Sequence, residues 1–203
     1  MTLRPYTTTL LLLCMYVSSA GQGSDLAQRR GLESMAARYL STFTSLQYPG
    51  LTNKAAFLSL FDAACTDLTN DYCRGTYRFV SALDYYEDIT AFFIDNPAVK
   101  VRSIWTSAPS QVLYGQQGDR YYIWLYKSFE YDRKSVVQYY CGWQRLEVVW
   151  LGPTWGYRII AIKPVVNPPS DSDGDQIPDQ FDDCPGTAKG KPTTITGCLV
   201  RDR

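Results

Sequence analysis

The sequence contains no histidine among its 203 residues. Histidine general bases, Ser-His-Asp triads, Cys-His nucleophile pairs and nearly all catalytic zinc sites are therefore excluded. Net charge is also missing, because 20 lysines and arginines balance 20 aspartates and glutamates. Without a global electrostatic field, the chain is a poor candidate for binding nucleic acid or an anionic membrane surface. A Gly-rich nucleotide fingerprint is absent as well.

No apolar run reaches the length of about 20 residues that a membrane-spanning helix needs. The run from Leu10 to Val17 follows Arg4 and precedes the small residues Ser18-Ser19-Ala20. This order predicts a secretory signal peptide over residues 1–20. We expect an exported protein without a transmembrane segment, in the periplasm, on the outer-membrane surface or outside the cell. Lipidation of Cys14 is the alternative, which the large Leu13 before it disfavours.

Removal of residues 1–20 leaves five of the six cysteines, and export favours their pairing. Pairing of Cys65 with Cys73 and of Cys184 with Cys198 is the simplest scheme, because each pair is close in sequence. Cys141 is then left over as a buried thiol. Pairing of Cys141 with Cys65, with Cys73 or with another chain remains open.

Residues 21–166 are predicted to form one α+β domain, with helices first and strands afterwards. The first helix is expected to begin at Ser24 or Asp25, the second at Thr52 or Asn53, and the third to span residues 80–93. Each of the first two carries one apolar stripe. The stripe residues are Leu32, Met35, Ala36, Tyr39, Leu40 and Phe43 in the first helix, and Ala56, Phe57, Leu60 and Phe61 in the second.

From Val99 the apolar residues recur with a period of two, which is typical of strands. We expect strands near residues 99–106, 121–131, 136–151 and 157–163, a turn over 115–119 and a bulge at Gly142. Aromatic residues are frequent, with 16 tyrosines and five tryptophans. The tryptophans are expected mainly in the core and in strand packing.

Three helices followed by long, aromatic antiparallel strands resemble the cone-shaped fold of the nuclear-transport-factor-like and ketosteroid-isomerase-like superfamily. The segments FLSLF and LTNDY are similar to envelope-associated versions in Bacteroidota-type bacteria. The resemblance implies helices packed on a curved antiparallel sheet, a cystatin-like cone. A small aromatic β-barrel with flanking helices is the alternative.

Enzymes of that superfamily use an inward carboxylate as a base, and Glu130 and Glu147 are the candidates here. Cross-strand ion pairs are the preferred interpretation, between Glu147 and Arg145 and between Glu130 and its neighbours Lys127 and Arg133. Asp84, beside Tyr85 and Tyr86, is a further unproven candidate. We therefore expect no catalytic residues, and an isomerase or dehydratase, or an apolar-ligand binder, is the alternative function.

Residues 167–170 form a Pro-rich linker, after which the composition changes completely. Carboxylates then fall at positions 1, 3, 5, 9 and 12 of a loop of twelve residues, a spacing that suits calcium. The seventh residue would add its backbone carbonyl. The predicted ligands are Asp171, Asp173, Asp175, Ile177, Asp179 and Asp182.

Residues 171–203 resemble a bacterial thrombospondin type 3 repeat, with its DxDGDxIPDxxDxCPGT pattern and a later Gly-Cys pair. Gln176 departs from the pattern, because that place is usually glycine, and we expect a slightly different turn and weaker binding. The repeat has few apolar residues, so calcium binding and ordering are expected to be one event that stiffens a spacer. The resemblance implies a role in cell adhesion or envelope anchoring.

The leading hypothesis is thus a non-catalytic, exported calcium-binding protein of the envelope or extracellular space. An envelope or cell-surface protein is the expected partner. A homodimer that buries the aromatic face of the sheet is a further hypothesis.

Overall fold

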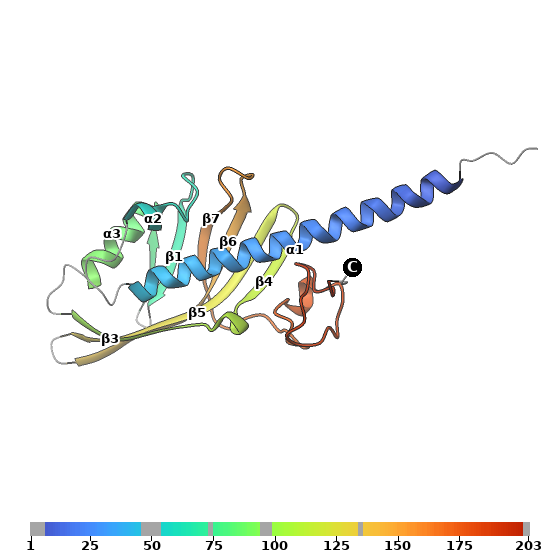
Figure 1. Cartoon of the computed structure of the whole chain (residues 1–203). Helices are drawn as coiled ribbons and strands as arrows, with labels where there is room; N and C mark the ends of the chain where they lie inside the picture. Colours follow the sequence, from blue (N-terminus) through green and yellow to red (C-terminus); the bar gives the residue numbers. More distant parts are fainter. Residues whose placement is uncertain (1–6, 46–53, 73–74, 94–98, 134–135, 201–203) are drawn as a thin grey trace, which may run out of the picture.

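The computed structural model describes residues 7–45, 54–72, 75–93, 99–133 and 136–200 (Figure 1). Helices α1 (Thr7–Ser45), α2 (Lys54–Leu58) and α3 (Ala82–Phe93) pack on one curved sheet. The predicted α+β class, with helices on a curved antiparallel sheet, is confirmed. No described helix combines the length and the apolarity needed to cross a membrane.

The sheet has the strand order β2-β1-β7-β6-β5-β3, and β4 pairs with the part of β5 that β3 leaves free. Only the β1–β7 pair is parallel among these pairings. The strands are β1 (Asp67–Tyr72), β2 (Gly75–Phe79), β3 (Val99–Thr106), β4 (Leu113–Gln117), β5 (Arg120–Arg133), β6 (Val136–Trp150) and β7 (Tyr157–Val165). The β1–β2 hairpin is an element that the sequence patterns did not predict.

Helix α1 lies across the helix-bearing face of the sheet and is longer than expected (Figure 1). It begins at Thr7, so neither Ser24 nor Asp25 is its N-cap. The predicted stripe is nevertheless correct where its side chains are described, because residues 32, 35, 36, 39 and 40 are all buried. Burial of this stripe against the sheet, which α1 contacts at β3, β5 and β7, is what holds the helix in place.

The second and third helices, in contrast, are shorter than predicted. Helix α2 ends at Leu58, and the buried Leu60 and Phe61 follow it in a turn that runs beside β7. Helix α3 starts at Ala82 and buries Tyr85 and Ile89.

The predicted bulge at Gly142 is wrong, and the predicted turn over 115–119 is present but shorter than expected. Gly142 pairs with Lys127 in unbroken register, and the irregularity of the β6–β7 pair lies in β7, where Ile160 is an extra residue opposite Glu147 and Val148. The turn near residue 117 is also tighter than expected. Residues 115–117 belong to β4, and the chain reverses at Gly118, whose φ of 63° suits a residue without a side chain.

Exposure contradicts the expectation that the tryptophans mainly fill the core. Trp124 is buried, but Trp105, Trp150 and Trp155 are 57%, 48% and 63% exposed. Trp150 and Trp155 flank the turn between β6 and β7, and both line an open pocket beside α1.

Cys65 is a free, buried thiol, so its predicted pairing with Cys73 is wrong. Its Sγ lies 3.1 Å from the carbonyl oxygen of Ile160 in β7, and strand β1 then carries the chain away from it. Cys73 and the side chains of Cys14 and Cys141 lie outside the described residues. The disulfide between Cys184 and Cys198 is formed as predicted.

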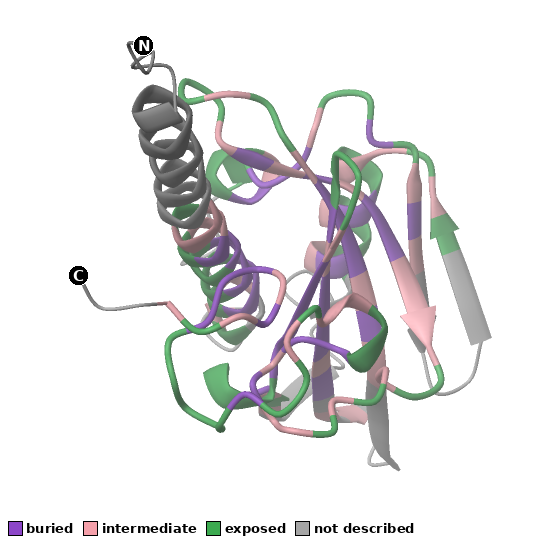
Figure 2. Ribbon diagram, turned by 90° about the vertical axis from the view of Figure 1, so that its right-hand side faces the viewer, coloured by how far each residue is buried: buried purple, intermediate pink, exposed green. Residues whose placement is uncertain are grey.

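The C-terminal segment packs against the α+β domain and does not project from it as a spacer. Ile177 and Ile195 are 0% and 1% exposed and belong to the same apolar cluster as the stripe of α1. Figure 2 shows this segment curled beside α1, with buried stretches facing the domain. Ile177 and Ile195 are therefore used for docking, which adds burial that the composition alone did not reveal.

Candidate metal centre

Three of the predicted ligands come together in the acidic loop. Carboxylate oxygens of Asp171, Asp173 and Asp175 all lie within 4.8 Å of one another. Each of these aspartates also accepts hydrogen bonds from backbone N–H groups a few residues later, for example those of Gly174 and Gln176 to Asp171. Such Asx turns fold a short polar loop around its own side chains and hold the carboxylates together.

Gln176 takes a left-handed backbone conformation of the kind that glycine favours. Its φ is 77°, the left-handed region, so the expected change of turn is not found. A side chain in this region costs about 1 to 2 kcal/mol, but this one is well bonded. Its Nε2 donates to the carbonyl oxygens of Pro109, at 2.6 Å, and Val112, at 3.0 Å. The glutamine side chain thus serves docking of the loop to the domain.

Among the candidate ligands, Asp175 has a buried carboxylate oxygen that the described part of the chain leaves without a hydrogen bond. It is 3% exposed, and its Oδ1 accepts a hydrogen bond from the N–H of Ile177. Its Oδ2 is enclosed and has no hydrogen-bond partner among the described residues. Burial, together with the charges of Asp173, Asp182 and Asp171, raises the pKa of Asp175 to about 6. A bound divalent cation would satisfy this oxygen and offset the repulsion, so the residues present fit calcium.

Asp182 reaches the same place from the other end of the loop. A Cβ on Gly197 would lie 2.0 Å from Oδ1 of Asp182 and 3.3 Å from Oδ2 of Asp175. Both carboxylates therefore crowd against one glycine, which explains the need for glycine before Cys198. Burial raises the pKa of Asp182 as well.

The remaining two predicted ligands lie differently. Both carboxylate oxygens of Asp179 accept hydrogen bonds from Ser172, from its backbone N–H at 2.8 Å and its hydroxyl at 2.9 Å. Asp179 is therefore not one of the three grouped aspartates. Ile177 has a fully buried side chain that anchors the loop on the domain. The sequence predicts that its backbone carbonyl oxygen is a calcium ligand and predicts no role for the side chain.

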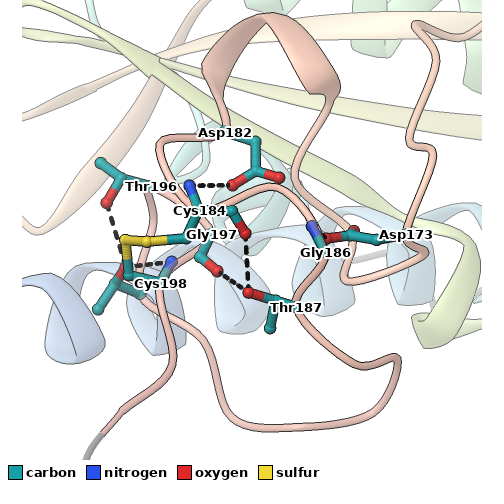
Figure 3. Close-up of a disulfide and its surroundings, with 9 residues drawn as sticks. Asp173, Asp182, Cys184, Gly186, Thr187, Thr196, Gly197 and Cys198 are labelled. Atoms are coloured by element: carbon teal, nitrogen blue, oxygen red, sulfur yellow. Dashed lines mark hydrogen bonds between the residues drawn. A yellow bond between two sulfur atoms is a disulfide. The ribbon is translucent and has the colours of Figure 1, made fainter.

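The disulfide holds the second half of the repeat against the loop (Figure 3). The N–H of Gly186 donates to Oδ2 of Asp173 at 2.8 Å, and that of Cys184 donates to Oδ1 of Asp182 at 2.8 Å. The hydroxyl of Thr187 lies 2.9 Å from the carbonyl oxygens of both Cys184 and Gly197. The cystine and the acidic loop thus form one hydrogen-bonded unit.

The C-terminal repeat contacts the sheet at its edge strand β4. The N–H of Tyr114 donates to the carbonyl oxygen of Gln176 at 2.9 Å, so the repeat covers part of this edge strand. On the sheet face away from the helices, the ring of Phe181 packs on Tyr122 and Trp124, with centroid distances of 5.9 and 5.6 Å. These contacts explain why Trp124 is buried on the sheet face away from α1, α2 and α3.

A second polar cluster, which the sequence analysis missed, lies inside the cone. Lys127 is 0% exposed, and its Nζ donates to the hydroxyl oxygens of Tyr85, at 2.9 Å, and Tyr39, at 3.1 Å. The hydroxyl of Tyr39 in turn donates to Gln144. Burial lowers the pKa of Lys127 well below its ordinary value. The predicted exposed ion pair with Glu130 is therefore wrong, because Lys127 shares the buried face of β5 with Ile123 and Leu125.

The candidate catalytic carboxylates lie outside this cluster. Glu147 pairs with Arg145 at 2.7 Å and with Arg120 at 3.5 Å, as predicted for an ion pair, although it is more buried than expected. It stands opposite Tyr122, on the sheet face away from the helices. Glu130 is half-buried on β5. Asp84 is exposed at the start of α3, where it accepts a hydrogen bond from the hydroxyl of Ser81.

Comparison with known proteins finds similar folds but no related sequence. No family model matches the chain. No curated protein matches it either. Among solved structures, a nuclear transport factor 2-like superfamily protein from Salmonella enterica is 13% identical, with a TM-score of 0.46, over 72% of this chain and 95% of that one.

Two further solved structures are similar at the same level. The beta subunit of benzoate 1,2-dioxygenase from Burkholderia mallei is 14% identical, with a TM-score of 0.44, over 67% of this chain and 88% of that one. A putative Ca/calmodulin-dependent kinase II association domain from Exiguobacterium sibiricum is 10% identical, with a TM-score of 0.40, over 83% of this chain and 100% of that one.

Proposed function

We propose that this protein is an exported, non-catalytic calcium-binding module, whose thrombospondin type 3-like repeat is fastened to an aromatic α+β domain. The observation that carries the proposal is the buried Oδ2 of Asp175, which has no hydrogen-bond partner among the described residues and stands beside two other carboxylates. Asp171, Asp173 and Asp175 would hold the cation, with Asp182 next to them. A site of oxygen ligands on a surface loop suits the millimolar calcium outside cells, with a dissociation constant of about 0.1 to 1 mM.

Calcium would act structurally here. It would neutralise carboxylates that repel one another, and it would favour the loop conformation in which Gln176 and Ile177 contact the domain. The free energy of calcium binding would then add to the stability of the docked repeat. A docked, calcium-dependent surface suits an adhesion or envelope-anchoring role, with another envelope or cell-surface protein as the partner.

Calorimetric titration of calcium into the protein purified after export tests this proposal. We expect one site per chain and a loss of binding of at least about tenfold in Asp175→Asn, since this substitution removes a ligand charge. Asp183→Asn is the matched control, because Asp183 is a neighbouring but exposed aspartate outside the predicted ligand set. Absence of binding, or equal binding by the two variants, would refute the proposal. Mass spectrometry of the same sample tests whether the mature chain starts at Gly21.

Catalysis inside the cone is a second candidate function, and one observation favours it. Lys127 and the hydroxyls of Tyr39 and Tyr85 form a buried polar cluster of the kind that can bind or protonate a carbonyl oxygen. An isomerase or dehydratase would use these groups in place of the predicted carboxylates. Screening carbonyl compounds for binding that Lys127→Met abolishes tests this alternative, and calcium binding by Lys127→Met controls for folding.

A further inference from the structure

Arg29 is a buried guanidinium at the junction of α1 and the C-terminal repeat. Its side chain is 5% exposed, and its Nε forms an ion pair with Glu33 at 2.9 Å. Its Nη2 lies 3.0 Å from Oε1 of Gln176 and 3.4 Å from the carbonyl oxygen of Asp175. The guanidinium also stacks over the ring of Tyr114, 4.6 Å from the centroid. These contacts fix its plane and its orientation.

One nitrogen of Arg29 has no such partner. Nη1 is enclosed by the protein and makes no hydrogen bond with any described residue. Leaving charged N–H donors unsatisfied in a buried place is costly, and in native proteins it often marks a water molecule or an ion. The flat, forked guanidinium is the side chain best suited to an oxyanion.

A pocket of about 320 Å³ adjoins this group, between α1 and the repeat. Besides Arg29, its lining includes the cationic side chains of Arg30, Lys189 and Lys191 and the hydroxyl-bearing Thr193. Arg30, Lys189 and Lys191 form no ion pair with another described residue. The pocket is therefore positively charged, although the net charge of the chain is zero.

The acidic residues of the pocket do not cancel this charge. Glu33 is already paired with Arg29. Asp175 also lines the pocket, but its carboxylate belongs to the aspartate cluster, where calcium would neutralise it. In this respect the inference rests on the proposed calcium site.

We propose that this pocket is a binding site for a tetrahedral oxyanion, a sulfate or phosphate group. Arg29 is the buried donor, and Lys189 and Lys191 supply the outer charges. The group can be a free inorganic ion or an ester on a saccharide, and the pocket volume accommodates either. Because Arg29 contacts both Asp175 and Gln176, anion and calcium binding stabilise the same loop conformation. Each ligand should therefore tighten the binding of the other by an equal factor.

Titration with sodium sulfate at constant ionic strength tests the proposal. Amide and arginine side-chain NMR signals are followed in the protein purified after export, first without and then with calcium. We expect saturable shifts at Arg29, Gly190 and Thr193, and tighter sulfate binding when calcium is present. A sulfated monosaccharide, galactose 6-sulfate, forms the second arm, and tighter binding of this ester than of sulfate identifies a saccharide-linked group as the ligand.

Variants separate the site from general charge effects. Lys189→Gln/Lys191→Gln changes two exposed residues and should weaken sulfate binding about tenfold, while Arg78→Gln, at an exposed position on β2, should leave it unchanged. Arg29→Lys should weaken it further, and its thermal unfolding verifies that it folds. Shifts that sodium chloride reproduces would overturn the oxyanion site. Binding of sulfate without any binding of calcium would support the oxyanion site and refute the proposed calcium-binding function.

Discussion

The side-chain amide of Gln176 donates a hydrogen bond to the backbone carbonyl of Val112, 3.0 Å away and 64 residues earlier in the chain. Val112 lies just before β4, so this bond connects the acidic loop to the edge of the sheet. The loop and the domain are therefore joined by the side chain of a residue that has a left-handed backbone conformation.

Gln176→Gly should separate calcium binding from docking. Glycine relieves the left-handed backbone strain but removes the bonds to Pro109, Val112 and Arg29. We expect calcium affinity to stay within about threefold, since the ligands are unchanged, while the repeat detaches more often from β4. Hydrogen exchange of the Tyr114 N–H, which donates to residue 176, measures that detachment. Unchanged protection of this amide would show that the glutamine contacts do not hold the repeat.

Gly115→Ala should disturb the contact between β4 and the repeat. An added Cβ would lie 2.7 Å from the Cδ2 atom of Phe181, so the ring must move away from Tyr122 and Trp124. We expect a loss of about 1 to 3 kcal/mol in the free energy of unfolding, as for other overpacked sites. Denaturant titration measures this loss.

The same substitution in a Phe181→Ala background provides the control for Gly115→Ala. Alanine at position 181 leaves room for the new methyl group, so the second substitution should cost less than about 0.5 kcal/mol there. An equal cost in both backgrounds would assign the effect to the strand itself and would contradict the proposed clash.

Lys127→Met should remove a pH dependence of stability. Burial lowers the pKa of Lys127 in the folded chain, whereas the unfolded value is about 10.4. Between these two values the unfolded chain binds more protons, so the free energy of unfolding of the wild type rises with pH. The stability advantage of Lys127→Met should therefore shrink as the pH increases from 7 towards 10.

Denaturant titrations of both proteins at several pH values measure that difference, in which the contributions of all other groups cancel. The slope approaches about 1.4 kcal/mol per pH unit where one proton is taken up on unfolding. A difference that is constant with pH would mean that Lys127 stays charged inside the cone.

Cys65 should be inert in the folded protein. Burial raises the pKa of its thiol to about 11, and its Sγ contacts the carbonyl oxygen of Ile160. At pH 8 we expect alkylation at least about 100-fold slower than for an unfolded thiol of pKa about 8.5. Mass spectrometry of the Cys65 peptide after iodoacetamide treatment, with and without guanidinium, measures this ratio. Rapid labelling of the native protein would contradict the buried position.

The repeating pattern of the chain was enough to predict the helix stripe of residues 32–40, the long β5 and β6 strands and the α+β class. These features depend on local periodicity, which a sequence displays directly. The Cys184–Cys198 disulfide and the grouping of Asp171, Asp173 and Asp175 were also predictable, because all their members lie within one short segment.

Features that depend on distant residues were not predictable in this way. The period of two along β5 does place Lys127 on the same face as Ile123 and Leu125, but only the packing of α1 and α3 shows that this face is sealed. Lys127 can be buried there because Tyr39 and Tyr85 supply hydroxyl oxygens for its amino group.

In the C-terminal repeat, too, local features were predictable from the sequence and long-range contacts were not. Its spacing of carboxylates is enough to indicate a cation, since ligand number and loop length are local properties. Whether the repeat projects or docks depends on partners that lie about 60 to 150 residues away, Val112, Tyr114 and Arg29. Chain folding alone brings these groups together, and it thereby places a buried guanidinium beside the acidic loop.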